Sequence, residues 1–296
     1  MKAFIPAFIA ALILSGAAGA QQAERDLIHP AWSPDGETIV FFERYETYGT
    51  IRSLSIASGK TVALTDGGTF DANPSFNPDG SGIAFSRSAP DMLGIWDIVT
   101  LDLASGKVTN VTDGPEREMH PQWSPDGERV SFVRFDKNGQ TDIFTVDLDT
   151  GSETQITHTP DASEFHPKWR ADSGALVFDR INGEQAVIVE IDLATRAETV
   201  CMTVDGGERI AVPSYSPDGS EVIFTRSRGD QNGLWKVDSK TQHADLLLPL
   251  EEDQNVGGAV FSPDGKKIAL HLANGDVFSL YMLNANDAGL TLLLDK

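Results

Sequence analysis

Short runs of apolar residues recur along the chain, and their spacing is typical of β-strands. Val130-Ser131-Phe132 and Val222-Ile223-Phe224 have the length and composition of buried strand segments. The segment 143–148 alternates apolar with polar side chains, and the Thr- and Val-rich segment 107–112 predicts a shorter edge strand. No sustained helical periodicity occurs after the first twenty residues. The pattern therefore predicts an all-β fold.

A four-residue turn of the form Ser-Pro-Asp-Gly separates the first and second apolar runs of each group. Proline presets φ, the aspartate side chain bonds nearby backbone, and glycine accepts a left-handed conformation. The turn recurs six times at intervals of 44 to 47 residues, with one degenerate copy at 170–173. The repeats are centred on Asp35, Asp79, Asp126, Asp172, Asp218 and Asp264. A large aromatic residue stands three positions before each aspartate: Trp32, Phe76, Trp123, Trp169, Tyr215 and Phe261.

Four short strands in a repeat of about 46 residues are typical of a propeller blade. A solenoid would use shorter repeats and would need capping ends. Six copies occupy the chain from residue 21 to residue 296. We therefore predict a six-bladed β-propeller with four antiparallel strands per blade. The repeated aromatic residues are expected to be buried between neighbouring blades.

The first twenty residues have the composition of a signal peptide. Lys2 is followed by an almost wholly apolar segment from 3 to 14, and Ala18-Gly19-Ala20 is a small-residue cleavage site. We expect cleavage before Gln21, which predicts a periplasmic or secreted protein. An uncleaved membrane anchor is the alternative. No second apolar stretch approaches the ~20 residues of a membrane helix, so no membrane span is expected after cleavage.

The chain is strongly acidic, with 23 basic and 44 acidic side chains and a formal net charge of −21. Such a surface repels nucleic acid, so nucleic-acid binding is excluded as a function. The charge serves solubility or attracts a cationic partner. The single cysteine, Cys201, excludes an intramolecular disulfide.

Polar residues also recur at positions that the fold would bring to one mouth of a central channel. Blades 2 to 4 share a carboxylate two residues before a His or Asn that precedes proline, and four second strands end in Phe-x-Arg. Because the innermost strands surround the channel, these side chains are candidates for ligand binding. The candidates are His29, Asp71, Asn73, Arg87, Glu118, His120, Arg134, Glu164, His166, Arg180 and Arg226.

Two interpretations of these positions remain open. The repeated carboxylates and arginines form a ring of ion pairs between blades, or three imidazoles from blades 1, 3 and 4 converge on a polar funnel. A convergent set of this kind has the chemistry of a transition-metal site or a catalytic base. The repetition favours the structural interpretation, so we predict no metal, no cofactor and no catalytic residue. We expect His158, His243 and His271 to fall on outer or connecting segments.

The stretch His-Pro-x-Trp-Ser-Pro-Asp-Gly stands nearly complete at 29–36 and at 120–127. It resembles the repeat of the TolB-type propeller family, a relative of the tryptophan–aspartate repeat, and the resemblance extends over all six copies. It implies a propeller with a role in the cell envelope. TolB carries a separate α/β domain before its propeller, for which the repeats leave no residues here. The Gly-x-Ser-x-Gly motif of propeller-bearing peptidases is also missing, so we expect a free-standing propeller.

These observations favour an exported scaffold that binds a protein or peptide in the cell envelope. We expect a monomer that needs no cofactor. The sequence favours a non-enzymatic role but leaves catalysis open. The alternative is a polysaccharide-active or sugar-binding propeller, in which His120 and His166 serve the site and Arg134 and Arg180 clamp an acidic sugar.

Overall fold

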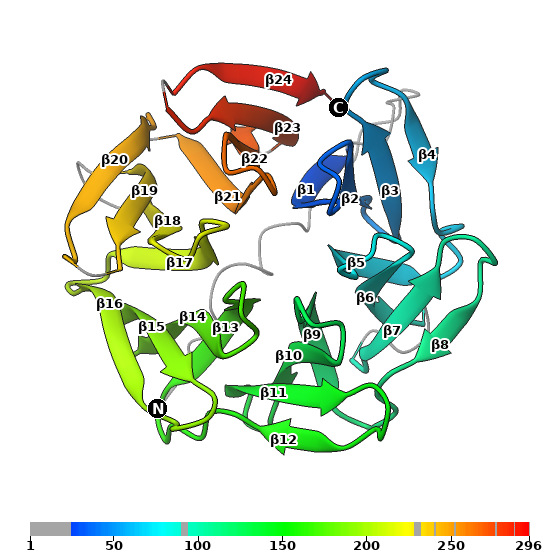
Figure 1. The fold of residues 1–296 in the computed structure, drawn as a ribbon, viewed down its shortest axis with the longest axis horizontal. Coiled ribbons are helices and arrows are strands. Elements are labelled where there is room, and N and C mark those ends of the chain that lie inside the picture. The colour runs from blue at the N-terminus through cyan, green and yellow to red at the C-terminus, as the bar shows by residue number, and fades with distance from the viewer. Residues whose placement is uncertain are drawn as a thin grey trace, which may run out of the picture.

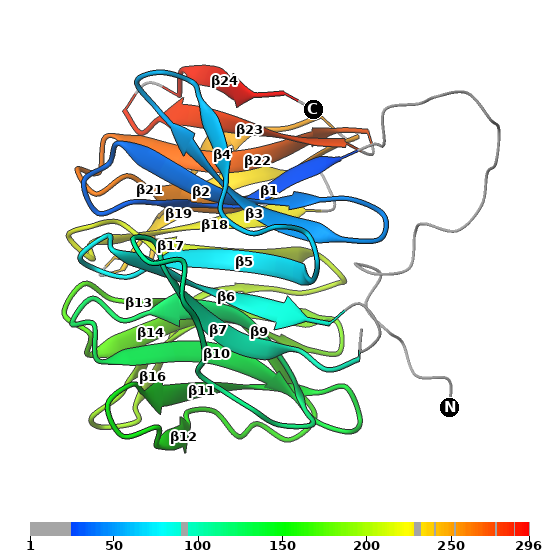
Figure 2. The same cartoon turned by 90° about the vertical axis from the view of Figure 1, so that its right-hand side faces the viewer.

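The computed structural model describes residues 25–89, 94–227, 232–239, 241–251, 253–275, 277–286 and 288–295. The predicted signal peptide at 1–20 lies outside these ranges. Within them every regular element is a strand, and the strands are arranged around a central opening (Figure 1). A side view shows a disc-shaped ring, with β12 and β24 at opposite edges (Figure 2).

Each sequence repeat contributes four consecutive strands, from the centre of the ring to its rim. The innermost are β1 (Asp26–Trp32), β5 (Phe70–Phe76), β9 (Arg117–Trp123), β13 (Ser163–Trp169), β17 (Arg209–Tyr215) and β21 (Gln254–Phe261). The second are β2 (Thr38–Arg44), β6 (Gly82–Ser88), β10 (Arg129–Phe135), β14 (Ala175–Asn182), β18 (Glu221–Ser227) and β22 (Lys267–Asn274). The third are β3 (Gly49–Ser55), β7 (Asp97–Asp102), β11 (Thr141–Asp147), β15 (Gln185–Asp192), β19 (Gly233–Asp238) and β23 (Val277–Asn284). The outermost are β4 (Thr61–Ala63), β8 (Val108–Asn110), β12 (Glu153–Gln155), β16 (Glu198–Val204), β20 (Ala244–Pro249) and β24 (Leu290–Leu294).

The hydrogen-bonded sheets differ from the predicted set of six equal blades. Four separate four-stranded sheets comprise β9–β12, β13–β16, β17–β20 and β21–β24, whereas β1–β8 form one eight-stranded sheet. The prediction of an all-β propeller is confirmed, but the prediction of six separate four-stranded blades is wrong. Four such blades stand in the ring, and the eight-stranded sheet completes it (Figure 1).

A close approach at Gly49 explains the merged sheet. Gly49 in β3 forms a parallel bridge to Phe70 in β5, which joins the first two repeats. A Cβ at Gly49 would lie 2.3 Å from a ring atom of Phe42 and 3.2 Å from the Asp71 carbonyl oxygen. A side chain here would clash with the Phe42 ring and crowd the Asp71 carbonyl, so glycine is favoured at this position. The repeat pattern carries no signal for this single contact.

Every innermost strand contains a β-bulge at the residue before the position that holds proline in five of the six repeats. The register against the second strand shifts there in all six repeats. The bulged residues have left-handed backbone, with φ from 53° to 57°. Asn and His tolerate this conformation better than most residues, whereas β-branched Val212 is an outlier. A bulge redirects side chains, so the residue at this position can point its side chain into the channel. The six residues are His29, Asn73, His120, His166, Val212 and Gly258.

Alternate positions of the second strands bury side chains on opposite faces of each sheet. The residue six positions after each repeat aspartate is fully buried in the core: Phe41, Phe85, Phe132, Phe178, Phe224 and Leu270. Because successive strand side chains point to opposite faces, the next residue belongs to the other face. That neighbouring position holds Phe42, Ser86, Val133, Asp179, Thr225 and His271.

The Ser-Pro-Asp-Gly turns pack against one another around the ring. The site of a Cβ at Gly80 lies 3.5 Å from Pro34 of the preceding turn, and that at Gly36 lies 3.7 Å from Pro263 of the last one. The Trp32 indole N–H also donates to the Val260 carbonyl at 3.3 Å. The last repeat therefore closes directly on the first.

The predicted burial of the repeated aromatic residues is confirmed only in part. Trp169 and Tyr215 are buried. Trp169 reaches the preceding repeat, because its indole N–H donates to the Gln122 carbonyl at 3.0 Å. The other four rings are only half-buried: Trp32, Phe76, Trp123 and Phe261.

Candidate functional site

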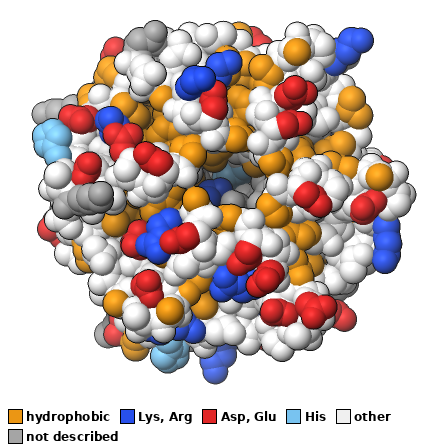
Figure 3. All heavy atoms as spheres, in the orientation of Figure 1, with side chains coloured by type: hydrophobic (Ala, Val, Ile, Leu, Met, Phe, Trp, Pro, Cys, Tyr) orange, Lys and Arg blue, Asp and Glu red, His pale blue; other side chains and the backbone are white. Residues whose placement is uncertain are grey.

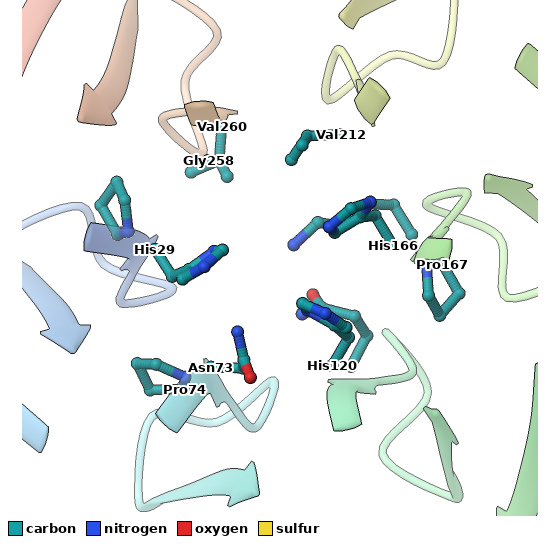
Figure 4. Close-up of a pocket in the computed structure, with 12 residues that line it drawn as sticks. His29, Asn73, Pro74, His120, His166, Pro167, Val212, Gly258 and Val260 are labelled. Carbon is teal, nitrogen blue, oxygen red and sulfur yellow. The ribbon is translucent and has the colours of Figure 1, made fainter. Parts of the chain in front are cut away.

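A small cavity of about 30 Å³ lies at the centre of the ring, where the bulged residues of the innermost strands meet. The side chains of His29, Asn73, His120 and His166 point toward this centre (Figure 4). Sequence reasoning placed these four residues at one channel mouth, and the structure brings them together. Val212 and Gly258 complete the circle without polar side chains. The other lining residues are Pro30, Pro74, Gln122, Pro167, Lys168 and Val260.

Four imidazoles form a continuous chain of edge contacts in the channel. Ring centroids are 5.4 Å apart for His271 and His29, 5.9 Å for His29 and His120, and 4.5 Å for His120 and His166. The His29 backbone N–H donates to His271 Nδ1 at 3.2 Å. The prediction that His271 lies on an outer or connecting segment is therefore wrong. His271 directly follows Leu270, the fully buried second-strand residue of its repeat, and this repeat position is the sequence signal that places it inside the ring.

Burial keeps most of these imidazoles neutral. Desolvation, together with neighbouring His271, His166 and cationic groups, holds the pKa of His29 well below 6.5. The pKa of His120 is lowered in the same way. For His271, burial and the nearby Arg44 lower the pKa to about 3. Neutral imidazoles each retain one N–H donor and one acceptor nitrogen, so they offer hydrogen bonds without charge.

His166 differs from the other rings because a buried carboxylate holds it. Its Nδ1 lies 2.8 Å from Asp179 Oδ1, and the Val212 backbone N–H donates to the same oxygen at 3.2 Å. Asp179 is 1% exposed. A carboxylate fixes both the orientation of an imidazole and the nitrogen that carries its proton. Asp179 was missed from the sequence, since Asp occurs at this repeat position only once.

Lys168 is the only Lys or Arg among the residues that line the cavity. Burial lowers its pKa to about 8. The space-filling view shows a central hollow with a Lys or Arg side chain and a His side chain at its base, surrounded by hydrophobic groups (Figure 3). The sequence gives Lys168 no repeat signature, because the other repeats carry small or neutral residues at this position.

The repeated carboxylates and arginines pair with each other and do not line the cavity. Asp71 binds Arg87 through both oxygens, at 2.7 and 2.9 Å. Glu164 accepts from Arg180 at 2.7 Å. Glu118 pairs with Arg134 in the same way, and Arg226 pairs with Glu208 at 2.8 Å.

These ion pairs lie within repeats, so the prediction of pairs between blades is wrong. Asp71 stands directly opposite Arg87 in the register of β5 and β6, and Glu118 stands opposite Arg134 in β9 and β10. Antiparallel neighbours are the strands whose side chains meet across a sheet face. The pairs therefore hold the first strand of a repeat to its second.

No group of three or more His, Cys, Asp or Glu arranged to hold a metal ion occurs in the part of the chain that the structure describes. In the channel, the imidazoles contact one another through their rings, and His166 Nδ1 is engaged by Asp179.

A second and larger cavity, of about 560 Å³, lies between the turns of the first two repeats. We call it the turn groove. The exposed carboxylates Asp35 and Asp79 both line it, and hydrogen bonds from Ser33 and Ser81 lower their pKa values. The groove therefore combines apolar surface with two negative charges. Its apolar lining comprises Pro34, Val40, Leu64, Phe76 and Leu103.

Comparison with known proteins agrees with this architecture. The family model described as the TolB beta propeller domain matches residues 17–256. The chain belongs to the TolB β-propeller family. The Tol-Pal system protein TolB of Francisella tularensis subsp. mediasiatica is 34% identical over 68 residues, which span 23% of this chain and 16% of that relative.

Two solved TolB structures share the fold. TolB from Acinetobacter baumannii superposes with a TM-score of 0.66 at 23% identity, over 77% of this chain and 55% of that one. Putative TolB from Agrobacterium tumefaciens gives a TM-score of 0.71 at 19% identity, over 83% and 88% of the two chains. The chain thus corresponds to only part of the Francisella tularensis and Acinetobacter baumannii proteins. No helix long and apolar enough to cross a membrane occurs among the residues described.

Proposed function

We propose that this TolB-family propeller is an exported scaffold that binds a protein or peptide in the cell envelope. Removal of the segment 1–20 would release the chain to the periplasm or the exterior. Family membership and the rigid ring of sheets support this role, because a propeller presents loops and grooves on a fixed frame. Function belongs to the site rather than to the fold, so the site must carry the assignment.

The turn groove is the observation that carries the proposal. Its volume of about 560 Å³ lies within the usual range of ligand sites. Leu64, Phe76 and Leu103 provide half-exposed apolar surface, and Asp35 and Asp79 provide negative charge beside it. A peptide with apolar side chains next to Lys or Arg matches this surface, and the formal net charge of −21 attracts such a partner. We expect the propeller itself to remain monomeric.

The geometry favours this role over the sugar-clamp alternative. Arg134 and Arg180, the arginines assigned to an acidic sugar, are each engaged by two carboxylates. Neither arginine lines the cavity that contains His120 and His166. A clamp would require arginines that are free to meet a ligand, so the peptide-binding role has the better support.

Site-specific photo-cross-linking in cells tests the proposal. A photoreactive phenylalanine analogue at Leu103, in the turn groove, should form a discrete adduct with an envelope protein. The same analogue at Val200, exposed on the outer strand β16, should not. The combined substitution Asp35→Asn and Asp79→Asn should reduce the adduct by about tenfold, because each lost ionic contact contributes about 1 kcal/mol or less at an exposed site.

The repeat structure provides a matched control for this experiment. Asp218→Asn with Asp264→Asn makes the same change in two equivalent turns that do not line the groove. This control should leave the Leu103 adduct unchanged. Equal adducts at Val200, or equal losses from the two double variants, would refute binding at the turn groove.

A further inference from the structure

The channel cavity contains one cation, the half-buried Lys168, and has no carboxylate among its lining residues. Desolvation lowers the pKa of Lys168, and no ion pair in the described part of the chain includes this side chain. Asp179 is the carboxylate next to the channel rings, and it is engaged by His166 and the Val212 backbone. A partly desolvated cation without a carboxylate partner leaves the cavity with a net positive charge.

Asn73 adds a polar side chain to the same cavity. Its side chain points toward the centre of the channel (Figure 4). The residue is 5% exposed, and its Oδ1 has no hydrogen-bond partner among the described residues. The side-chain NH2 of Asn73 is a hydrogen-bond donor, and an anion in the cavity can accept from it.

The local field favours an anion despite the acidic surface. Arg117 lowers the pKa of His120, and Arg44, which pairs with Asp26, lowers the pKa values of His29 and His271, as nearby positive charge does. Lys168 also lowers the pKa values of His29 and His120. Exposed carboxylates on the rim are screened over a Debye length of about 8 Å at physiological salt, whereas buried charges are screened much less.

The cavity volume limits the size of the occupant. A single water needs roughly 10–15 Å³ of such space, so about 30 Å³ accommodates two or three atoms of that size. Polar side chains enter from different sides, with Asn73 on one side and His166 on another (Figure 4). An anion with two oxygens fits this arrangement better than a spherical ion does. A phosphate or a sugar is too large.

We propose that the channel cavity binds a small carboxylate, with Lys168 as its counter-ion and Asn73 and a channel imidazole as hydrogen-bond donors. This site is independent of the turn groove, and the two can be tested separately. The carboxylate can belong to a free acid or to the end of a peptide chain. Both sources present the same two oxygens to the same groups.

Titration with sodium formate, followed by NMR or calorimetry, tests the site on the mature chain. We expect saturable binding that weakens at least tenfold in Lys168→Met, which keeps the length of the side chain and removes its charge. Asn73→Ala should weaken binding by a smaller factor. Lys266→Met, at an exposed lysine outside the cavity, is the matched control and should bind as the unaltered chain does. Melting temperatures establish that each variant is folded.

The dependence on pH provides a second readout. Formate binds the protonated form of Lys168, so affinity should decline by about tenfold for each unit above pH 8. Chloride of equal affinity, unchanged binding in Lys168→Met, or no saturable binding at all would overturn the proposal. Glycylglycine with a free carboxyl end, compared with its amide, identifies the source. Binding of the free peptide supports a peptide end, and binding of formate alone supports a free acid.

Discussion

Acidification from about pH 7 to about pH 4 is expected to destabilise the propeller by several kcal/mol, because buried imidazoles must stay neutral in the fold. The pKa of His271 is about 3 in the folded chain and near 6.5 in the unfolded chain. The unfolded state therefore binds the proton first as the pH falls. Each pH unit of this window costs about 1.4 kcal/mol, so His271 alone accounts for about 3 kcal/mol at about pH 4. The pKa values of His29 and His120 are shifted in the same direction.

The sign of this effect distinguishes it from that of the buried carboxylates. Stability from the imidazoles is present above about pH 6.5 and is lost as the pH falls toward the folded pKa values. Burial raises the pKa values of Glu118 and Glu164, which makes stability rise as the pH falls through the same region. A comparison between the unaltered chain and a histidine variant cancels the carboxylate contribution.

His271→Asn is the appropriate variant, because Asn Oδ1 can replace Nδ1 as the acceptor for the His29 N–H. Urea unfolding at a series of pH values should show a weaker acid dependence in this variant than in the unaltered chain. His243→Asn, at an exposed position, should leave the curve unchanged. If the curves of the unaltered chain and His271→Asn are parallel, His271 is not a buried neutral imidazole.

Trp169→Ala is expected to lower the free energy of unfolding by about 3–5 kcal/mol, as for other large core truncations. Trp169 is 8% exposed and packs with Ile143 of the preceding repeat. Its indole N–H bonds the Gln122 carbonyl, and the Arg129 guanidinium lies 4.7 Å from its ring centroid. The substitution therefore removes contacts that join β13 to the sheet of β9–β12.

Trp123 occupies the same repeat position and provides the control. It is half-buried, and its indole N–H bonds the Gly127 carbonyl of its own turn. Trp123→Ala should consequently cost less than Trp169→Ala when both are measured by urea unfolding. A Trp123 variant that loses as much stability as the Trp169 variant would show that burial between repeats does not set the difference.

The repeat made most of the fold predictable. The turn centred on Asp126 lies between β9 and β10, and the alternating segment 143–148 lies largely in β11. Both predictions succeeded because turn chemistry and strand alternation are local properties of a sequence. The merged sheet of β1–β8 depends on one contact at Gly49 between distant segments, so local patterns could not reveal it.

The site was predictable only where it followed the repeat. His29, His120 and His166 share one position and therefore meet at the axis. Lys168 and Asp179 occur once each at their positions, so repetition did not mark them. The ion pairs were assigned to the wrong partners because a list of residues does not show which strands lie side by side. The antiparallel register, which opposes Asp71 to Arg87, decides it.

One measurement tests directly whether the ion pairs that hold the strands of each repeat together are separate in role from the imidazoles that face the channel. It is the free energy of unfolding of Asp71→Asn and His120→Ala, measured by urea at about pH 7.5. Asp71→Asn leaves Arg87 without its carboxylate and should cost about 3 kcal/mol. His120→Ala removes a neutral ring that lies beside a cavity and forms no hydrogen bond with the described residues, so it should cost about 1 kcal/mol or less. A loss in His120→Ala as large as that in Asp71→Asn would contradict the separation and make the imidazoles part of the structural frame.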